Sequence, residues 1–163
     1  KKESEIKRKI QNIKIEFKKI KDEQLVFLNG KNISKEIRLQ EVTRNVSYVA
    51  AMKCIREEMV KRQILFGENG SIIMDGRDIG TAVFKDANLK IYLTASPEIR
   101  AKRRKADLDK LKEINSIKDL IKDIRRRDHL DSSREISPLS KAQDAIVIDS
   151  SYLNINEVIE KIE

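Results

Sequence analysis

The stretch SIIMDGRDIG, residues 71–80, gives the strongest indication of the fold. A short apolar run at residues 71–74 is followed at once by a turn that contains two glycines and several charged residues. In open α/β sheets, ligands lie beyond the carboxyl ends of strands, and glycines let the backbone approach them closely. Arg77 in this place suits a phosphate, and Asp78 suits an amino group or a sugar hydroxyl. The alternative is a turn with a local ion pair.

Two further short apolar runs lie downstream, at residues 89–93 and 145–148. Segments with helical spacing separate them, and Ser96, Ser116 and Asn154 are typical residues for the beginning of a helix. Short apolar runs that alternate with helices predict parallel strands, including one at residues 71–74, in an α/β domain.

The first third of the chain has a different pattern. Isoleucines in residues 1–20 fit a helix, but residues 13–17 also alternate like a strand. We favour a helix to about Gln11, then a strand, then a second strand at residues 24–28 that ends at the turn Asn29-Gly30. Residues 41–66 have a helical pattern with a break near Met52. This predicts a small antiparallel element followed by helices.

Composition limits the class of protein. The 163 residues are 39% hydrophobic, which suits one domain, and 35 Lys+Arg against 27 Asp+Glu give a formal charge of +8. A basic balance favours polyanionic partners, although a charged surface is the plain alternative. The single cysteine, Cys54, excludes an internal disulfide and suits a reducing compartment. No apolar run approaches the roughly 18 residues that a membrane helix needs.

Residues 125–134 form a second candidate site. Arg127, Asp131 and Arg134 are spaced by four and three, so they share one face if a helix continues through them. Two guanidinium groups around a carboxylate suit a phosphorylated sugar, whereas a solvated face with ion pairs is the alternative. His129 is the only histidine, and alone it makes no metal site.

A third basic cluster lies at residues 100–105 and includes Arg103 and Arg104. Such a cluster neutralises a polyphosphate or simply keeps the surface soluble. Residues 102–115 are very polar and offer little to pack, so we expect a mobile flap there.

Several motifs follow one another in a specific order. Residues 75–84 read DGRDIGTAVF, Asp86-Ala87 follows, and residues 89–98 read LKIYLTASPE. Upstream lie LNG at 28–30, SKEIR at 34–38 and a helix with Ser47 and Arg56. From about Ile13 to its end, the chain resembles the bacterial cytidylate kinase family.

The resemblance implies an α/β fold of the nucleoside monophosphate kinase type within the P-loop superfamily. A parallel sheet would be flanked by helices, with a CMP-binding antiparallel insertion at about residues 12–40 and a mobile lid at about 100–115. The whole of residues 1–163 would be a single kinase domain. The implied reaction moves the γ-phosphoryl group of ATP to CMP or dCMP, with Mg²⁺, in a cytoplasmic and monomeric enzyme.

The resemblance also implies roles for residues. Ser47, Arg56 and Asp78 would face the cytosine, and Asp131 would bind the sugar hydroxyls. The implied substrate-binding set is Ser47, Arg56, Asp75, Arg77, Asp78, Arg127, Asp131 and Arg134. The implied catalytic set, which contacts phosphates or closes over the transferring group, is Arg77, Arg103, Arg104, Arg127 and Arg134. No residue is expected to bind a metal.

The chain departs from the family at one large point. No glycine-rich sequence ending in Lys-Ser or Lys-Thr occurs in it, and it has only five glycines. A smaller departure is Lys85, where the family usually has proline. We therefore expect a truncated chain that lacks the first strand and the phosphate loop, through which ATP and Mg²⁺ would mainly bind. Alone, it is expected to be inactive and not to form an ordinary stable monomer, so that its edge strands pair with each other or with another copy of the chain.

Two other classes of function stay open. One is a kinase-derived pseudoenzyme that binds CMP without turning it over. The other is a basic nucleic-acid-binding module, which the sequence disfavours because three Tyr, four Phe and no Trp leave little for base stacking. We therefore expect no nucleic acid and no membrane among the partners.

Overall fold

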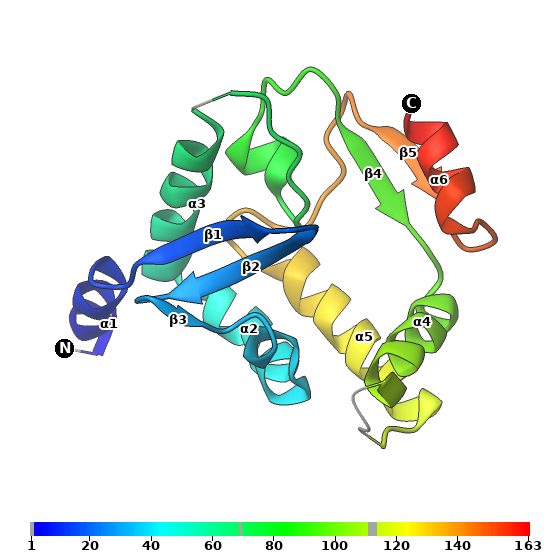
Figure 1. The fold of residues 1–163 in the computed structure, drawn as a ribbon, viewed down its shortest axis with the longest axis horizontal. Coiled ribbons are helices and arrows are strands. Elements are labelled where there is room, and N and C mark those ends of the chain that lie inside the picture. Colours follow the sequence, from blue (N-terminus) through cyan, green and yellow to red (C-terminus); the bar gives the residue numbers. More distant parts are fainter. Residues whose placement is uncertain (1, 69, 111–113) are drawn as a thin grey trace. The chain divides into compact units, whose positions relative to one another are not determined.

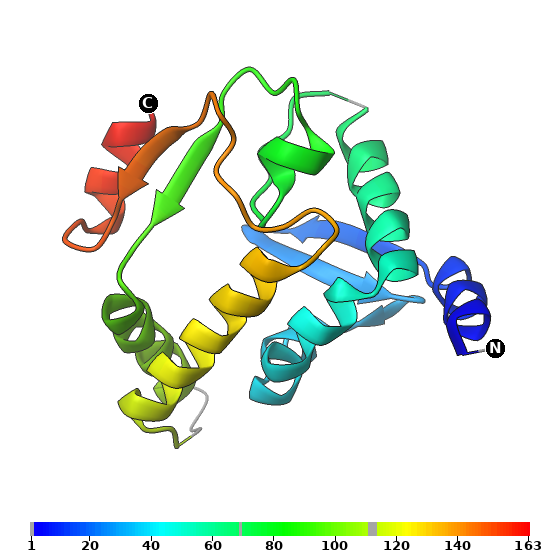
Figure 2. The same cartoon turned by 180° about the vertical axis from the view of Figure 1, so that it is seen from behind.

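The computed structural model describes residues 2–68, 70–110 and 114–163. It falls into two compact units, Lys1–Gly70 and Ser71–Glu163. Figure 1 labels the elements, and Figure 2 shows them from behind. No helix in the described ranges is long and apolar enough to cross a bilayer.

The first unit contains a three-stranded antiparallel sheet in the order β1-β2-β3, formed by Ile15–Ile20, Glu23–Leu28 and Lys31–Asn32. A two-residue turn joins each pair of strands. The second turn, Asn29-Gly30, has φ values of 48° and 81°, the conformation that tight hairpins require and that Asn-Gly adopts readily. This confirms both predicted strands and the turn predicted at the end of the second strand.

Helices make up the rest of the first unit: α1 (Lys2–Gln11), a 3₁₀ turn at Glu36–Arg38, α2 (Gln40–Ala51) and α3 (Lys53–Gly67). Met52 between α2 and α3 has extended backbone with ψ 123°, which confirms the predicted break. Arg62 of α3 donates hydrogen bonds to the carbonyls of Ile13 and Ile10, at 2.5 and 2.7 Å, so α3 fixes the point where helix gives way to strand.

The second unit contains a parallel pair, β4 (Ile91–Thr94) and β5 (Ile146–Asp149). The predicted strand at residues 71–74 is wrong, because these residues form no regular structure. Ile73 is 102% exposed, so the apolar run is not buried as a central strand would be. Among the described strands β4 pairs only with β5, and an apolar run without a neighbouring strand gains no ladder hydrogen bonds. The expected self-association stays a prediction.

Three helices complete the second unit: α4 (Pro97–Lys110), α5 (Ile117–Ser133) and α6 (Ile155–Ile162). Each begins as the sequence predicts. The hydroxyl of Ser116 accepts a hydrogen bond from the Asp119 amide at 3.1 Å, and Asn154 forms a reciprocal capping box with Glu157.

The expectation that residues 102–115 have little to pack is wrong for the part that lies in α4. Ala101 and Leu108 are both 0% exposed and pack with Leu120 of α5, which is 3% exposed. Residues seven apart lie on one helix face, so two apolar side chains are enough to bury that face against α5. Both views show α4 and α5 side by side. Residues 111–113 of the expected flap lie outside the described residues.

Candidate functional site

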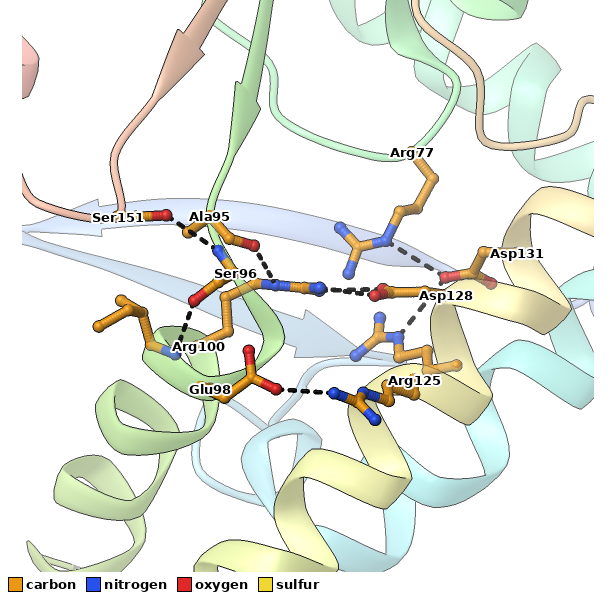
Figure 3. Close-up of polar contacts among 11 residues, drawn as sticks. Arg77, Ala95, Ser96, Glu98, Arg100, Arg125, Asp128, Asp131 and Ser151 are labelled. Carbon is orange, nitrogen blue, oxygen red and sulfur yellow. Dashed lines mark hydrogen bonds and ion pairs between the residues drawn. The ribbon is translucent and has the colours of Figure 1, made fainter.

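A group of charged side chains in the second unit converges on Asp131, near the end of α5. Arg77 Nε donates a hydrogen bond to Asp131 Oδ2 at 3.2 Å, as Figure 3 shows. Arg127 Nε lies 3.6 Å from the same oxygen, and Arg134 Nη1 lies 3.8 Å from Asp131 Oδ1. Together with Asp78, these residues are called the arginine–aspartate cluster below. The cluster brings together the two predicted motifs, residues 75–80 and 125–134.

The centre of the cluster is buried. The side chains of Asp131 and Arg134 are each 4% exposed and that of Asp78 is 5% exposed. Arg134 Nη2 lies 3.6 Å from Asp78 Oδ1, so Arg134 faces a carboxylate on each side. Buried charges are costly unless opposite charges compensate them, which makes this network sensitive to the loss of any member.

The cluster carries an excess of positive charge. Its three guanidinium groups face two carboxylates, which leaves a formal charge of one (three minus two). Burial lowers the pKa of Arg127, and the nearby Arg77 lowers that pKa further. The buried Nε of Arg127 has no hydrogen-bond partner among the described residues. An anion placed here would supply both the missing charge and the missing acceptor.

The turn at residues 76–83 positions Arg77 and Asp78. The carbonyl of Asp78 accepts the Ala82 amide at 2.8 Å and begins a π-helical turn, Ile79–Val83. A Cβ atom on Gly76 would lie 2.8 Å from the Ile79 side chain, so a larger residue here would force that side chain to shift. The close approach explains why a glycine directly precedes Arg77.

Arg134 reaches the cluster in a way that helical spacing did not predict. α5 ends at Ser133, and Arg134 has extended backbone with φ −65° and ψ 145°. The continuing helix that would place Arg134 on one face with Arg127 is therefore absent at this residue. Instead, Arg134 Nε donates to the carbonyl of Ser137 at 2.5 Å, and this bond directs the guanidinium group.

A second set of ion pairs joins the beginning of α4 to α5 (Figure 3). Arg100 donates to both carboxylate oxygens of Asp128, at 2.9 and 2.6 Å, and to the carbonyl of Ala95 at 2.9 Å. The hydrogen bond to Asp128 raises the pKa of Arg100. Arg125 pairs with Glu98 at 2.7 Å. The sequence interpretation missed the pairing of Arg100 with Asp128, since the partners are 28 residues apart and no local pattern links them.

The structure ties one predicted lid residue to the end of β5. Arg103 donates to the hydroxyl of Ser150 at 3.1 Å and to its carbonyl at 2.5 Å. Arg104 is half-buried and Asp75 is exposed. The roles of these three residues toward a nucleotide stay predictions.

Ser47 and Arg56 belong to the first unit. Ser47 is 7% exposed, and its hydroxyl has no hydrogen-bond partner among the described residues. Arg56 Nε donates to the carbonyl of Ala50 at 2.9 Å, across the break between α2 and α3. Their role in binding cytosine stays a prediction.

The described residues offer no group of three or more His, Cys, Asp or Glu side chains that could hold a metal ion. His129 is exposed on α5, and Cys54 is buried in α3.

Comparison with known proteins gives one family. The family described as cytidylate kinase matches residues 1–163. Curated cytidylate kinases from Bacillus thuringiensis (strain Al Hakam), Bacillus cereus (strain AH187) and Bacillus anthracis (strain A0248) are each 47% identical to this chain over 160 residues. Each match covers 98% of this chain and 71% of the relative.

Proposed function

Because the chain belongs to the cytidylate kinase family, we propose that its arginine–aspartate cluster binds the phosphate and the sugar of CMP. The activity is that of a phosphotransferase, which moves a phosphoryl group from ATP to CMP. The observation that carries the proposal is the buried Nε of Arg127, which has no hydrogen-bond partner among the described residues. The pKa of this arginine is lowered by burial and by Arg77.

Each member of the cluster has a role that suits its chemistry. Arg77, Arg127 and Arg134 contact the phosphate, because planar guanidinium groups match two phosphate oxygens at once. Asp131 accepts hydrogen bonds from the sugar hydroxyls, and the neighbouring arginines keep its charge compensated. Roles of Asp78, Ser47 and Arg56 toward the cytosine are proposed from the family alone.

These residue types suit phosphoryl transfer. The reaction depends on positioning and on neutralising charge rather than on a protein nucleophile. The attacking atom is a phosphate oxygen of CMP itself. The arginines hold that phosphate in place and offset the charge that accumulates when two phosphates approach each other.

The family also implies ATP as the phosphoryl donor. The sequence has no glycine-rich loop ending in Lys-Ser or Lys-Thr. Arg103 and Arg104 are therefore the residues of this chain that are proposed to contact ATP. Mg²⁺, when bound, would neutralise phosphate charge. The described residues offer no group of three or more His, Cys, Asp or Glu side chains that could hold it.

The wider setting is also a proposal. A cytoplasmic location suits the family and the single free thiol of Cys54. The family also implies a parallel sheet with more strands than the pair β4 and β5. Nucleic-acid binding is disfavoured, because the arginines of the cluster face aspartates rather than forming an exposed basic stripe.

Base choice tests the proposal. CMP and dCMP are expected to bind at least about tenfold more tightly than AMP or GMP, which corresponds to about 1.4 kcal/mol. The reason is that a pocket built to hydrogen-bond one base leaves its polar groups without partners when another base enters. Calorimetric titration of the chain with the four nucleotides measures this. A purine monophosphate that binds as tightly as CMP would refute the assignment.

A further inference from the structure

Ser137 has a backbone conformation that a residue with a side chain seldom adopts. Its φ is 48°, in the left-handed region, where the Cβ atom crowds the following carbonyl. It also directly precedes Pro138, and a proline restricts the backbone of the residue before it. Unfavourable backbone at a residue other than glycine persists only where the surroundings hold it, and such residues cluster at functional sites.

The contacts of this turn lead to the arginine–aspartate cluster. The carbonyl of Ser137 accepts the hydrogen bond from Arg134 Nε at 2.5 Å. Two residues later, the amide of Leu139 donates to the carbonyl of Asp131 at 2.7 Å. The turn therefore binds the side chain of Arg134 and the main chain of Asp131.

The three nitrogens of the Arg134 guanidinium group have different partners. Nε is taken up by the Ser137 carbonyl, so the orientation of the guanidinium plane follows the orientation of that carbonyl. The terminal nitrogens face Asp131 and Asp78 at 3.8 and 3.6 Å, which are ion-pair distances longer than a hydrogen bond. These are the nitrogens that a phosphate would meet.

We propose that Ser137 is a positioning residue for phosphate binding, and that its left-handed backbone aims its carbonyl at Arg134 Nε. The inference rests on the proposed CMP site, since it concerns how that site is held. A residue that favours ordinary backbone at position 137 would rotate the carbonyl away and turn the guanidinium plane, without changing any group that touches the nucleotide.

The test compares two variants and two ligands. Ser137→Val introduces a β-branched residue that tolerates positive φ poorly, whereas Ser137→Gly is the matched control that tolerates it well. Calorimetry measures the Kd for CMP and for cytidine, which lacks the phosphate, and thermal melting reports folding. Ser137→Val is expected to weaken CMP binding by about tenfold and to leave cytidine binding unchanged, because one charge-assisted contact is misdirected. Ser137→Gly is expected to keep the wild-type ratio of the two Kd values.

The other outcomes separate the explanations. Equal weakening of CMP and cytidine binding by Ser137→Val would show a merely structural role and overturn the inference. Wild-type affinity of Ser137→Val for both ligands would overturn it as well. A wild-type chain that binds CMP no better than cytidine would instead overturn the proposed phosphate site itself. If Ser137→Val does not fold, Ser137→Thr, which is also β-branched but keeps the hydroxyl, gives the same comparison.

Discussion

Asp131→Ala is expected to lower the free energy of unfolding by about 3–5 kcal/mol, the cost typical of removing one partner from a buried ion pair. The carboxylate is 4% exposed and faces three guanidinium groups, of which that of Arg134 is equally buried. Without Asp131, the three guanidinium groups of the cluster keep only one of its two carboxylates, that of Asp78. Urea denaturation at neutral pH, extrapolated to zero denaturant, measures the change.

The control is another aspartate that pairs with a cation on the surface. Asp109 forms an i,i+4 pair with Lys105 and its side chain is 52% exposed, so Asp109→Ala is expected to cost no more than about 0.5 kcal/mol. If the two alanine variants lost the same stability, the cluster would not be the buried network described above.

Arg134→Met is expected to weaken CMP binding by about 10- to 100-fold, or roughly 1.5–3 kcal/mol, through the loss of a charge-assisted contact. Methionine keeps much of the aliphatic part of the Arg134 side chain but lacks the guanidinium charge. Asp78 and Asp131 would then face the phosphate without the cation that they share. Titration of the variant with CMP measures the effect.

His129→Ala is the matched control for that experiment. His129 lies on the same helix as Asp131 but is exposed, so its loss is expected to leave CMP affinity within about twofold. Equal effects of the two substitutions would contradict the assignment of the phosphate site to this end of α5.

Local features of the fold could be predicted from the sequence because their causes are local. The Asn29-Gly30 turn, the hydroxyl of Ser116 and the break at Met52 each depend on a few neighbouring residues. The grouping of Arg127 with Asp131 also follows from helical spacing within α5.

Features that depend on distant partners could not be predicted in this way. An apolar run becomes a strand only if another strand lies beside it, which is why residues 71–74 failed as a prediction. Leu108 is buried in a stretch whose composition is almost entirely polar, because a single apolar face suffices against α5. The role proposed for Ser137 could not be predicted from its residue type, because it depends on the direction of a main-chain carbonyl.

The most direct test of the central claim is a crystal structure of the chain with CMP bound. We expect the phosphate to lie within hydrogen-bond distance of the guanidinium groups of Arg77, Arg127 and Arg134, with a sugar hydroxyl donating to Asp131. The Nε of Arg127, which has no partner among the described residues, is expected to donate to a phosphate oxygen. A CMP phosphate bound elsewhere, with the arginine–aspartate cluster unchanged, would contradict the account.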